Sequence, residues 1–327
     1  MSDFPVALLL STSAGTNDED LTAIFTEIAD ADRKKIAVTT SDGTTQCYVE
    51  IEKWDSTNKK AALHVKIPSI SSSSNTELYL YYDSGHADNT TYVGDTGDSP
   101  AQNVWDSNFE GVWHLAQDPS GGSGAIKDST SNNVNATSSG SMTSDDLVDA
   151  LVCKGLDLDG SDDYIKTSGL SFNPSNSATI EICFKETTLA GTVDRLLLQQ
   201  QDGTGTGRTI IGIEEHDDAT NPDKIYCNLA GTILYGSQLS AGSFYHAAVT
   251  HDGSNAVEIF LNGSSDTTDT RTVEAASGEM LFGIGKDELT YPFDGIIDEV
   301  RISQTQRSDA WIKATYHTLF DSLGAWK

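Results

Sequence analysis

Basic residues are scarce in this sequence. Its 327 residues contain 20 Lys and Arg against 49 Asp and Glu, which gives a formal net charge of −29. Binding to nucleic acid or to an anionic membrane needs clustered Lys and Arg that neutralise phosphates, so the composition excludes both roles for the bulk surface. The acidic excess fits binding of divalent cations or a saline environment, and it fits equally well simple solubility through charge repulsion.

Long apolar runs are also missing. No stretch approaches the length of a membrane span, so we expect no membrane insertion. The first residues lack a basic region and residues 6–10 are too short for the apolar part of a signal peptide, so no secretory signal is visible. The protein works in the cytosol, or a leader was removed, or it leaves the cell by another route such as assembly into a virus particle.

Cysteine is rare and unpaired in sequence. Cys47, Cys153, Cys183 and Cys227 form no CxxC motif, which argues against a zinc site. Cys183 and Cys227 both lie in strand-like segments. They form a disulfide if those strands are neighbours in an oxidising compartment, and otherwise they are small buried hydrophobic residues.

Catalytic motifs are absent as well. The seven histidines are scattered, and none lies in a nucleophile elbow, an HExxH motif or a kinase-type loop. The densest acidic cluster, residues 214–218, lacks the spacing of the paired carboxylates of glycosidases, and we expect a solvated loop or a weak cation site there. The sequence therefore predicts no enzyme activity.

What the chain does contain is a long series of short β-rich segments separated by polar turns, which is typical of antiparallel sandwiches. Residues 17–31 are expected to form a helix, residues 86–108 a linker, residues 308–318 a second helix and residues 320–324 a closing strand. We predict an all-β protein of two tandem antiparallel β-sandwiches, a domain at 1–105 and a jelly roll at 106–327. The predicted strands are 6–10, 35–40, 46–54, 61–67, 76–82, 112–115, 157–158, 164–165, 178–184, 195–199, 209–213, 224–229, 244–250, 257–261, 280–284 and 296–302.

Three segments carry a family resemblance. They are Phe293-Asp294-Gly295-Ile296-Ile297-Asp298-Glu299-Val300-Arg301-Ile302-Ser303, Gly160-Ser161-Asp162-Asp163-Tyr164-Ile165 and Ala256-Val257-Glu258-Ile259-Phe260-Leu261-Asn262-Gly263. In this order they resemble the laminin-G-like jelly roll of the concanavalin A-like superfamily. The resemblance implies binding of glycans or proteins rather than chemistry.

The first domain resembles an uncharacterised β-sandwich domain that stands before laminin-G-like domains in bacterial surface proteins and phage proteins. The matching segments include Phe4-Pro5-Val6, the turn Ser41-Asp42-Gly43 and the strand Glu77-Leu78-Tyr79-Leu80-Tyr81-Tyr82. That family usually has another strand before Phe4. We therefore expect residues 6–10 to form an open sheet edge that pairs with another chain, unless the 17–31 helix covers it.

The resemblance also implies a structural calcium ion between an early loop and the last long strand. Asp128 and Asn133 of an oxygen-rich loop, with Asp298 of the strand, are the expected ligands. The alternative is that Asp128 and Asn133 form an ordinary Asx turn.

For a sugar ligand, aromatic rings could form the platform. Tyr291 and its neighbour Asp287 are the best exposed candidates. Tyr235 and Tyr245 are further candidates, although tyrosines in sandwich strands more often serve packing.

The function predicted from these features is a non-catalytic recognition or structural module. A phage virion protein, as a capsid decoration or tail-associated protein at the virion surface, is the first expectation. It would be part of an oligomer or assembly, contact other virion or surface proteins through its N-terminal domain, and bind carbohydrate. The alternatives are a secreted bacterial cell-surface adhesin and the carbohydrate-binding part of a polysaccharide-degrading enzyme.

Overall fold

The fold was analysed in a computed structural model, which describes residues 1–189, 192–200, 209–216, 218–229, 231, 233–285 and 290–327. Two compact units divide the chain. The N-terminal unit comprises Met1–Ser107, Ser129–Ser131 and Ala314–Lys327, and the C-terminal unit comprises Asn108–Asp128 and Asn132–Lys313. Among the described residues, no helix is long and apolar enough to cross a membrane.

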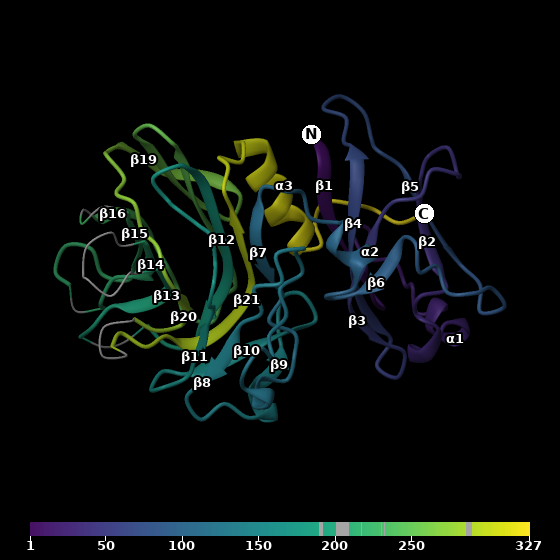
Figure 1. The fold of residues 1–327 in the computed structure, drawn as a ribbon, viewed down its shortest axis with the longest axis horizontal. Helices are drawn as coiled ribbons and strands as arrows, with labels where there is room; N and C mark the ends of the chain where they lie inside the picture. Colours follow the sequence, from purple (N-terminus) through teal and green to yellow (C-terminus); the bar gives the residue numbers. More distant parts are fainter. Residues whose placement is uncertain (190–191, 201–208, 217, 230, 232, 286–289) are drawn as a thin grey trace. The chain divides into compact units, whose positions relative to one another are not determined.

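The N-terminal unit is built from two small sheets that share one apolar core. One sheet runs in the order β1-β4-β3-β6 and the other pairs β2 with β5 (Figure 1). Val38, Val49 and Leu63 contribute to the core between them. The elements of this unit are β1 (Ser2–Leu10), α1 (Ile24–Glu27), η1 (Asp30–Asp32), β2 (Ile36–Thr40), β3 (Val49–Asp55), β4 (Lys60–Ser69), β5 (Leu78–Tyr82), β6 (Val93–Asp95) and α2 (Ser99–Gln102).

The C-terminal end of the chain completes this unit. Helix α3 (Asp309–Leu319) ends within it. Trp326, which follows the helix, bonds to Asn17. Its backbone N–H donates to the Asn17 side chain at 2.9 Å, and its carbonyl accepts a hydrogen bond from the Asn17 amide at 2.8 Å. The Trp326 ring packs against the core of the unit. Residues 320–324 form no strand, so that prediction is wrong. Single hydrogen bonds hold this segment in place of a ladder: the Gly15 N–H donates to the Asp321 carboxylate at 2.8 Å, and the Thr16 N–H donates to the Gly324 carbonyl at 2.7 Å.

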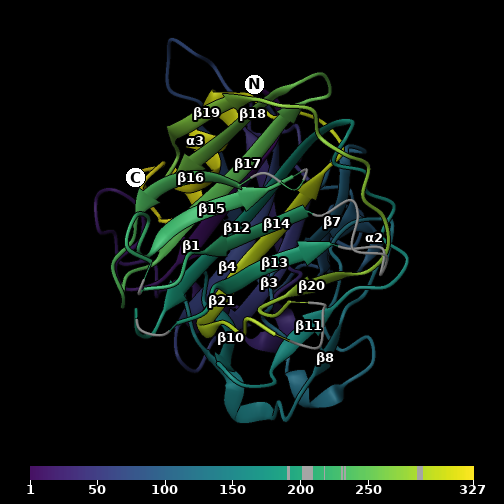
Figure 2. The ribbon, with the colours of Figure 1, turned by 90° about the vertical axis from the view of Figure 1, so that its left-hand side faces the viewer.

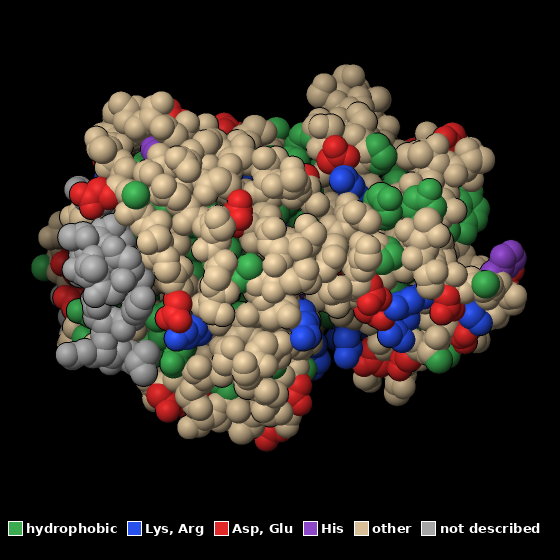
Figure 3. Space-filling model, in the orientation of Figure 1, with side chains coloured by type: hydrophobic (Ala, Val, Ile, Leu, Met, Phe, Trp, Pro, Cys, Tyr) green, Lys and Arg blue, Asp and Glu red, His purple; other side chains and the backbone are tan. Residues whose placement is uncertain are grey.

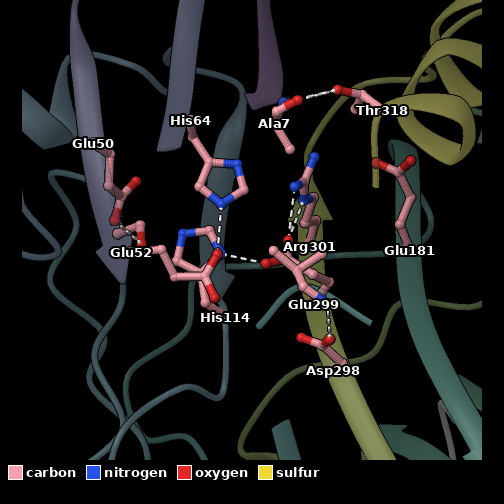
Figure 4. A network of polar contacts seen from close by, with 12 residues as sticks. Ala7, Glu50, Glu52, His64, His114, Glu181, Asp298, Glu299, Arg301 and Thr318 are labelled. Carbon is pink, nitrogen blue, oxygen red and sulfur yellow. Dashed lines mark hydrogen bonds and ion pairs between the residues drawn. The ribbon is translucent and has the colours of Figure 1, made fainter. Parts of the chain in front are cut away.

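Strand β1 lies at the edge of its sheet, as the sequence predicts. It pairs with β4 along one side. The other side of β1 bonds to α3 at one residue. The backbone N–H of Ala7 donates to Thr318 Oγ1 at 2.8 Å, and the Thr318 hydroxyl donates to the Ala7 carbonyl at 2.9 Å (Figure 4). A side chain of α3 therefore bonds the N–H and C=O groups of Ala7 at this edge, which leaves fewer backbone groups for pairing with another strand.

Two predictions for the N-terminal unit are wrong. Instead of one helix over 17–31 the structure has only α1 and η1, because Asn17 bonds to Trp326 rather than capping a helix. Residues 86–108 are not a linker, because β6 pairs in parallel with β3 and Asp95 forms ion pairs with Arg33 at 2.6 Å and Lys34 at 2.8 Å.

The C-terminal unit is a sandwich of two antiparallel sheets, as predicted. The back sheet runs β19-β18-β17-β12-β21-β10-β9, with β7 also paired to β21, and the front sheet runs β16-β15-β14-β13-β20-β11-β8. Figure 2 looks onto the outer face of the front sheet. The elements are β7 (Phe109–Trp113), η2 (Pro119–Gly121), β8 (Thr137–Ser139), η3 (Ser144–Asp146), β9 (Leu147–Asp149), β10 (Lys154–Asp159), β11 (Tyr164–Lys166), β12 (Ser177–Glu186), β13 (Arg195–Gln200), β14 (Thr209–Ile213), β15 (Lys224–Asn228), β16 (Ile233–Gln238), β17 (Tyr245–Asp252), β18 (Ala256–Leu261), β19 (Ser264–Thr270), β20 (Met280–Phe282) and β21 (Asp294–Ser303).

The core of this unit lies between the two sheets. Trp113 is fully buried there, with its ring centroid 5.3 Å from that of Phe282 and its indole N–H donating to the Val134 carbonyl at 2.9 Å. All four cysteines are free thiols, and Cys183 and Cys227 lie on different sheets. The disulfide alternative is therefore wrong, and the two residues pack as small buried side chains.

A buried group of charges joins the two sheets at one end of the sandwich. Arg195 of β13 contacts Glu186 of β12 at 2.5 Å and Asp223 at 3.1 Å. Asp223 also contacts His216 at 2.7 Å. Burial raises the pKa of Glu186 to about 7, although Arg195 opposes the shift and Asp223 reinforces it.

Replacing Thr318 by Val should destabilise the N-terminal unit by about 1–3 kcal/mol, because the N–H and C=O of Ala7 would lose their buried partner. Chemical denaturation measures the change. Thr91→Val, at an exposed position, is the control and should stay within about 0.5 kcal/mol of the wild type. Equal stability of the two variants would contradict the assigned role of Thr318.

Stability should fall as the pH rises from about 4.5 to about 7. Because the folded-state pKa of Glu186 lies above its unfolded value, the folded state holds more protons in this window and loses stability as they dissociate. The contribution is at most about 3 kcal/mol. Denaturation at pH 5 and pH 8 should show a smaller pH effect for Glu186→Gln than for the wild type, and an unchanged pH effect would rule out Glu186 as its source.

Candidate functional site

The outer face of the front sheet carries an aromatic and apolar patch. Alternate residues of its strands point away from the core. Leu196, Ile210 and Tyr226 form a buried cluster on this outer face, and Tyr235 packs against it. Tyr226 and Tyr235 are direct cross-strand partners of β15 and β16, with ring centroids 6.2 Å apart in an edge-to-face arrangement.

Each of these tyrosines bonds to its own carboxylate. The Tyr226 hydroxyl donates to Asp194 at 2.9 Å, and the Tyr235 hydroxyl donates to Glu214 at 2.5 Å. Asp194 directly precedes β13 and Glu214 directly follows β14. Because these are antiparallel neighbours, the start of one and the end of the other meet at the same end of the sheet.

The electrostatics of this tyrosine–carboxylate cluster (Asp194, Glu214, Tyr226 and Tyr235) follow from burial. Burial raises the pKa of Glu214, the Tyr235 hydroxyl opposes the shift, and the hydrogen-bonded carboxyl of Asp194 reinforces it. Burial also raises the pKa of both tyrosines well above its usual range, so their hydroxyls remain neutral donors. The cluster therefore offers carboxylate acceptors beside aromatic rings, a combination suited to a ligand rich in hydroxyl groups.

Tyr291 lies beside this cluster. Its carbonyl accepts a hydrogen bond from the Leu196 N–H at 3.0 Å, which ties its loop to β13 next to Asp194. The side chain is 43% exposed. Its backbone φ of +59° is uncommon for an aromatic residue and marks a constrained turn. The other predicted ligand-binding residue, Asp287, lies outside the described residues.

Sequence reasoning missed most of the cluster. A solvated loop was expected at 214–218, yet Glu214 is only 9% exposed because it continues β14 and bonds to Tyr235. That interpretation is wrong for Glu214. A usable signal was present: Tyr226 and Tyr235 stand in segments that can pair across a short turn, with acidic residues at the ends of the preceding strands.

The expected calcium ligands differ in their hydrogen bonds and burial. Asp128 accepts backbone hydrogen bonds from Val112 at 3.0 Å and from Val134 at 2.9 Å, which fastens its loop to β7. Asn133 adopts a left-handed backbone, with a φ of +54°. The Asp128 bonds are longer in range than those of an Asx turn, in which the side chain bonds to the backbone two residues on.

Asp298 is fully buried in β21. One of its oxygens accepts a hydrogen bond from the Val152 N–H at 2.8 Å, and the other has no hydrogen-bond partner among the described residues. Burial and the charge of Glu299 raise its pKa, which favours a protonated carboxyl where no cation is bound. Within the described part of the chain, the groups of three or more acidic, His or Cys side chains that could hold a metal include neither Asp128 nor Asp298. Calcium binding stays a prediction.

The neighbouring residues of β21 form a row of paired charges. Glu299 contacts His114 at 2.5 Å and accepts hydrogen bonds from Arg301 at 2.7 and 3.0 Å. Glu181 of β12 stands opposite Arg301 (Figure 4). These side chains are buried and neutralise one another, so we interpret them as structural.

Two parts of the chain match models of known domain families. Residues 159–313 match the model of the concanavalin A-like lectin/glucanases superfamily, and residues 32–111 match a domain of unknown function. No curated protein matches the chain.

Solved structures resemble part of this chain at low identity. The chain is similar to domain 4 of AbnA, a GH43 extracellular arabinanase from Geobacillus stearothermophilus, in complex with arabinotriose (18% identity, 63% of this chain and 97% of that chain, TM-score 0.49). It is similar to the binding domain of Paraclostridial Mosquitocidal Protein 1 (14% identity, 64% of this chain and 52% of that chain, TM-score 0.50). It is also similar to the binding domain of botulinum neurotoxin serotype D (13% identity, 64% and 52%, TM-score 0.47).

The chain thus spans about half the length of the two toxin domains, with 52% of each covered, and at these identities the likeness concerns the fold alone. The family matches agree with the resemblance expected from the sequence. The chain carries a laminin-G-like domain of the concanavalin A-like lectin/glucanases superfamily at residues 159–313, preceded by a domain of unknown function at residues 32–111.

Proposed function

We propose that the C-terminal unit is a non-catalytic carbohydrate-binding module. Its ligand would dock on the outer face of the front sheet, at the tyrosine–carboxylate cluster and Tyr291. The observation that carries this proposal is the meeting of Asp194, Glu214 and Tyr235 at one end of that sheet, where the backbone of the exposed Tyr291 is also tied to β13. The superfamily of the domain includes lectins, which supports the same ligand class.

The arrangement of the two carboxyl groups argues for binding rather than hydrolysis. Glycosidases hold their acid and their nucleophile or base about 5–5.5 Å apart when they retain configuration and about 6.5–9.5 Å apart when they invert it, so that a sugar and a water fit between them. Asp194 reinforces the raised pKa of Glu214, and each of the two carboxyl groups accepts a hydrogen bond from its own tyrosine. Because tyrosine hydroxyls engage both groups, we interpret them as acceptors for a ligand rather than as the acid and the nucleophile of a hydrolase.

Weak single sites of this kind gain strength when they are arrayed, because linked copies convert later binding events into intramolecular ones. This supports a role in an assembly that displays several copies. A virion surface is the location we propose from the sequence, and a secreted adhesin is its alternative. Mass spectrometry of purified particles separates the two.

Replacing Tyr291 by Ala or Glu214 by Gln should weaken glycan binding about tenfold, which corresponds to about 1.4 kcal/mol. The first change removes an exposed ring and the second removes a charged acceptor. A glycan array probed with multimerised protein identifies the ligand, and calorimetry with that glycan measures the affinity.

The control for Tyr291→Ala is Leu323→Ala, because both side chains are 43% exposed and Leu323 belongs to the N-terminal unit. An equal effect of both changes, or no glycan bound above background by the wild type, would remove the support for this site.

The calcium prediction is tested separately. If calcium binds the native state alone, a hundredfold excess over Kd should raise the free energy of unfolding by about 2.7 kcal/mol. Melting curves with calcium and with a chelator should then differ, and Asp298→Asn should abolish the difference because it removes the buried carboxylate. Superimposable wild-type curves would exclude a calcium site.

A further inference from the structure

A second aromatic surface lies in the N-terminal unit, on the ribbon formed by β2 and β5. Tyr79 and Tyr81 are alternate residues of β5 and share its outer face, while Leu78 and Leu80 pack against the core. The two tyrosines are 44% and 48% exposed, and their ring centroids are 6.2 Å apart. In Figure 3, apolar and aromatic side chains gather over this part of the N-terminal unit.

Small side chains lie beside these rings. Tyr79 pairs across the ribbon with Thr39, and Tyr81 pairs with Ala37. Neither partner is large enough to cover a tyrosine ring. The two tyrosines therefore form an open aromatic shelf along the strand.

A polar pocket adjoins one end of this shelf. Its volume is about 380 Å³, and its wall includes Glu77, two residues before Tyr79, and Thr40, one residue after Thr39. Most of its lining side chains carry hydroxyl, amide or carboxylate groups. The lining residues are Thr40, Ser41, Ile67, Pro68, Ser69, Ser71, Asn75, Thr76 and Glu77.

We propose that this shelf and pocket form a second carbohydrate site, which binds a neutral, extended β-linked hexose polymer. One sugar would stack its apolar face on Tyr79 and Tyr81, and the chain would continue into the pocket, where hydroxyl and amide groups exchange hydrogen bonds with sugar hydroxyls. This assigns a glycan-binding role to the domain of unknown function and goes beyond the site proposed for the C-terminal unit.

Three observations select this ligand over others. The shelf runs along a strand, so it fits an extended chain with one flat face rather than a compact side chain. The pocket offers many uncharged donors and acceptors, as a polyhydroxylated ligand requires. The net charge of −29 disfavours acidic polysaccharides, whereas a neutral one meets no repulsion, and the carboxylate of Glu77 is already paired with Lys327 at 2.8 Å.

The test uses the full chain and titrates cellohexaose, chitohexaose, β-1,4-mannohexaose and the acidic hexagalacturonate by calorimetry. At least one neutral hexasaccharide should bind, and hexagalacturonate should not. Tyr79→Ala combined with Tyr81→Ala should weaken binding of that neutral sugar about tenfold or more, and Asn75→Ala should weaken it less. The matched control is Tyr82→Ala, because Tyr82 is 40% exposed but belongs to the opposite face of β5.

The outcomes separate this site from the one proposed above. Loss of binding in the Tyr79/Tyr81 variant, with the control and Tyr291→Ala unchanged, supports the N-terminal site. Binding that depends on Tyr291 but survives loss of Tyr79 and Tyr81 overturns it and leaves the C-terminal site standing. Absence of binding to every neutral hexasaccharide also overturns it, as does a double variant that changes only self-association in sedimentation.

Discussion

Strand β21 is buried along nearly its whole length, and this constraint organises the C-terminal unit. The strand pairs with β12, β10 and β7, so its charged residues have no access to water. A buried charge is tolerated only when it is paired or neutralised. Glu299 accordingly contacts both His114 and Arg301, and burial raises the pKa of Asp298 well above its usual value.

The backbone of β21 reflects the same constraint. Its register with β12 shifts between Ile182 and Cys183, and Glu299 has a left-handed φ of +53°. A bulge of this kind inserts one residue and changes the direction of the side chains that follow. It brings Glu299 and Arg301 onto one face, where each meets a partner, while Val300 and Ile302 join the core. In the front sheet the buried charge of Arg195 lies at the start of β13, where Glu186 and Asp223 pair with it. Asp194 and Glu214 flank the strands of this sheet, where carboxylates can meet a ligand.

Much of the architecture could be predicted from the sequence, because apolar and polar residues alternate in strands such as β12 and β18. The order of the two domains followed because the segments around Ser41 and Glu77 precede those around Gly160 and Asp294. Short strands with few apolar residues escaped prediction, among them β8, β16 and β19, because pairing rather than composition makes them strands. The helix predicted at 17–31 failed for a related reason: its amphipathic pattern is real, but Asn17 bonds to a residue 309 positions away in the chain.

The candidate site was harder to predict than the fold. Tyr291 was identified from its exposure in a polar loop, whereas Asp194, Glu214 and Tyr226 come together only through the register of β13, β14 and β15. Tyr79 and Tyr81 were recognised as strand residues, yet nothing in their local sequence distinguishes an exposed face from a buried one. A pattern of alternation gives two faces but does not say which one meets water.

The bond between Ala7 and Thr318 also has a consequence for biosynthesis. A ribosome makes the first strand of the N-terminal unit about 300 residues before the side chain that covers its edge. Chains fold from the N-terminus as they emerge, at about 5–20 residues per second, so this edge waits for tens of seconds while the C-terminal unit is synthesised. The hydrogen bonds between Ala7 and Thr318 therefore form late. Until they form, the nascent N-terminal unit exposes a strand edge that can pair with a neighbouring chain on the same messenger.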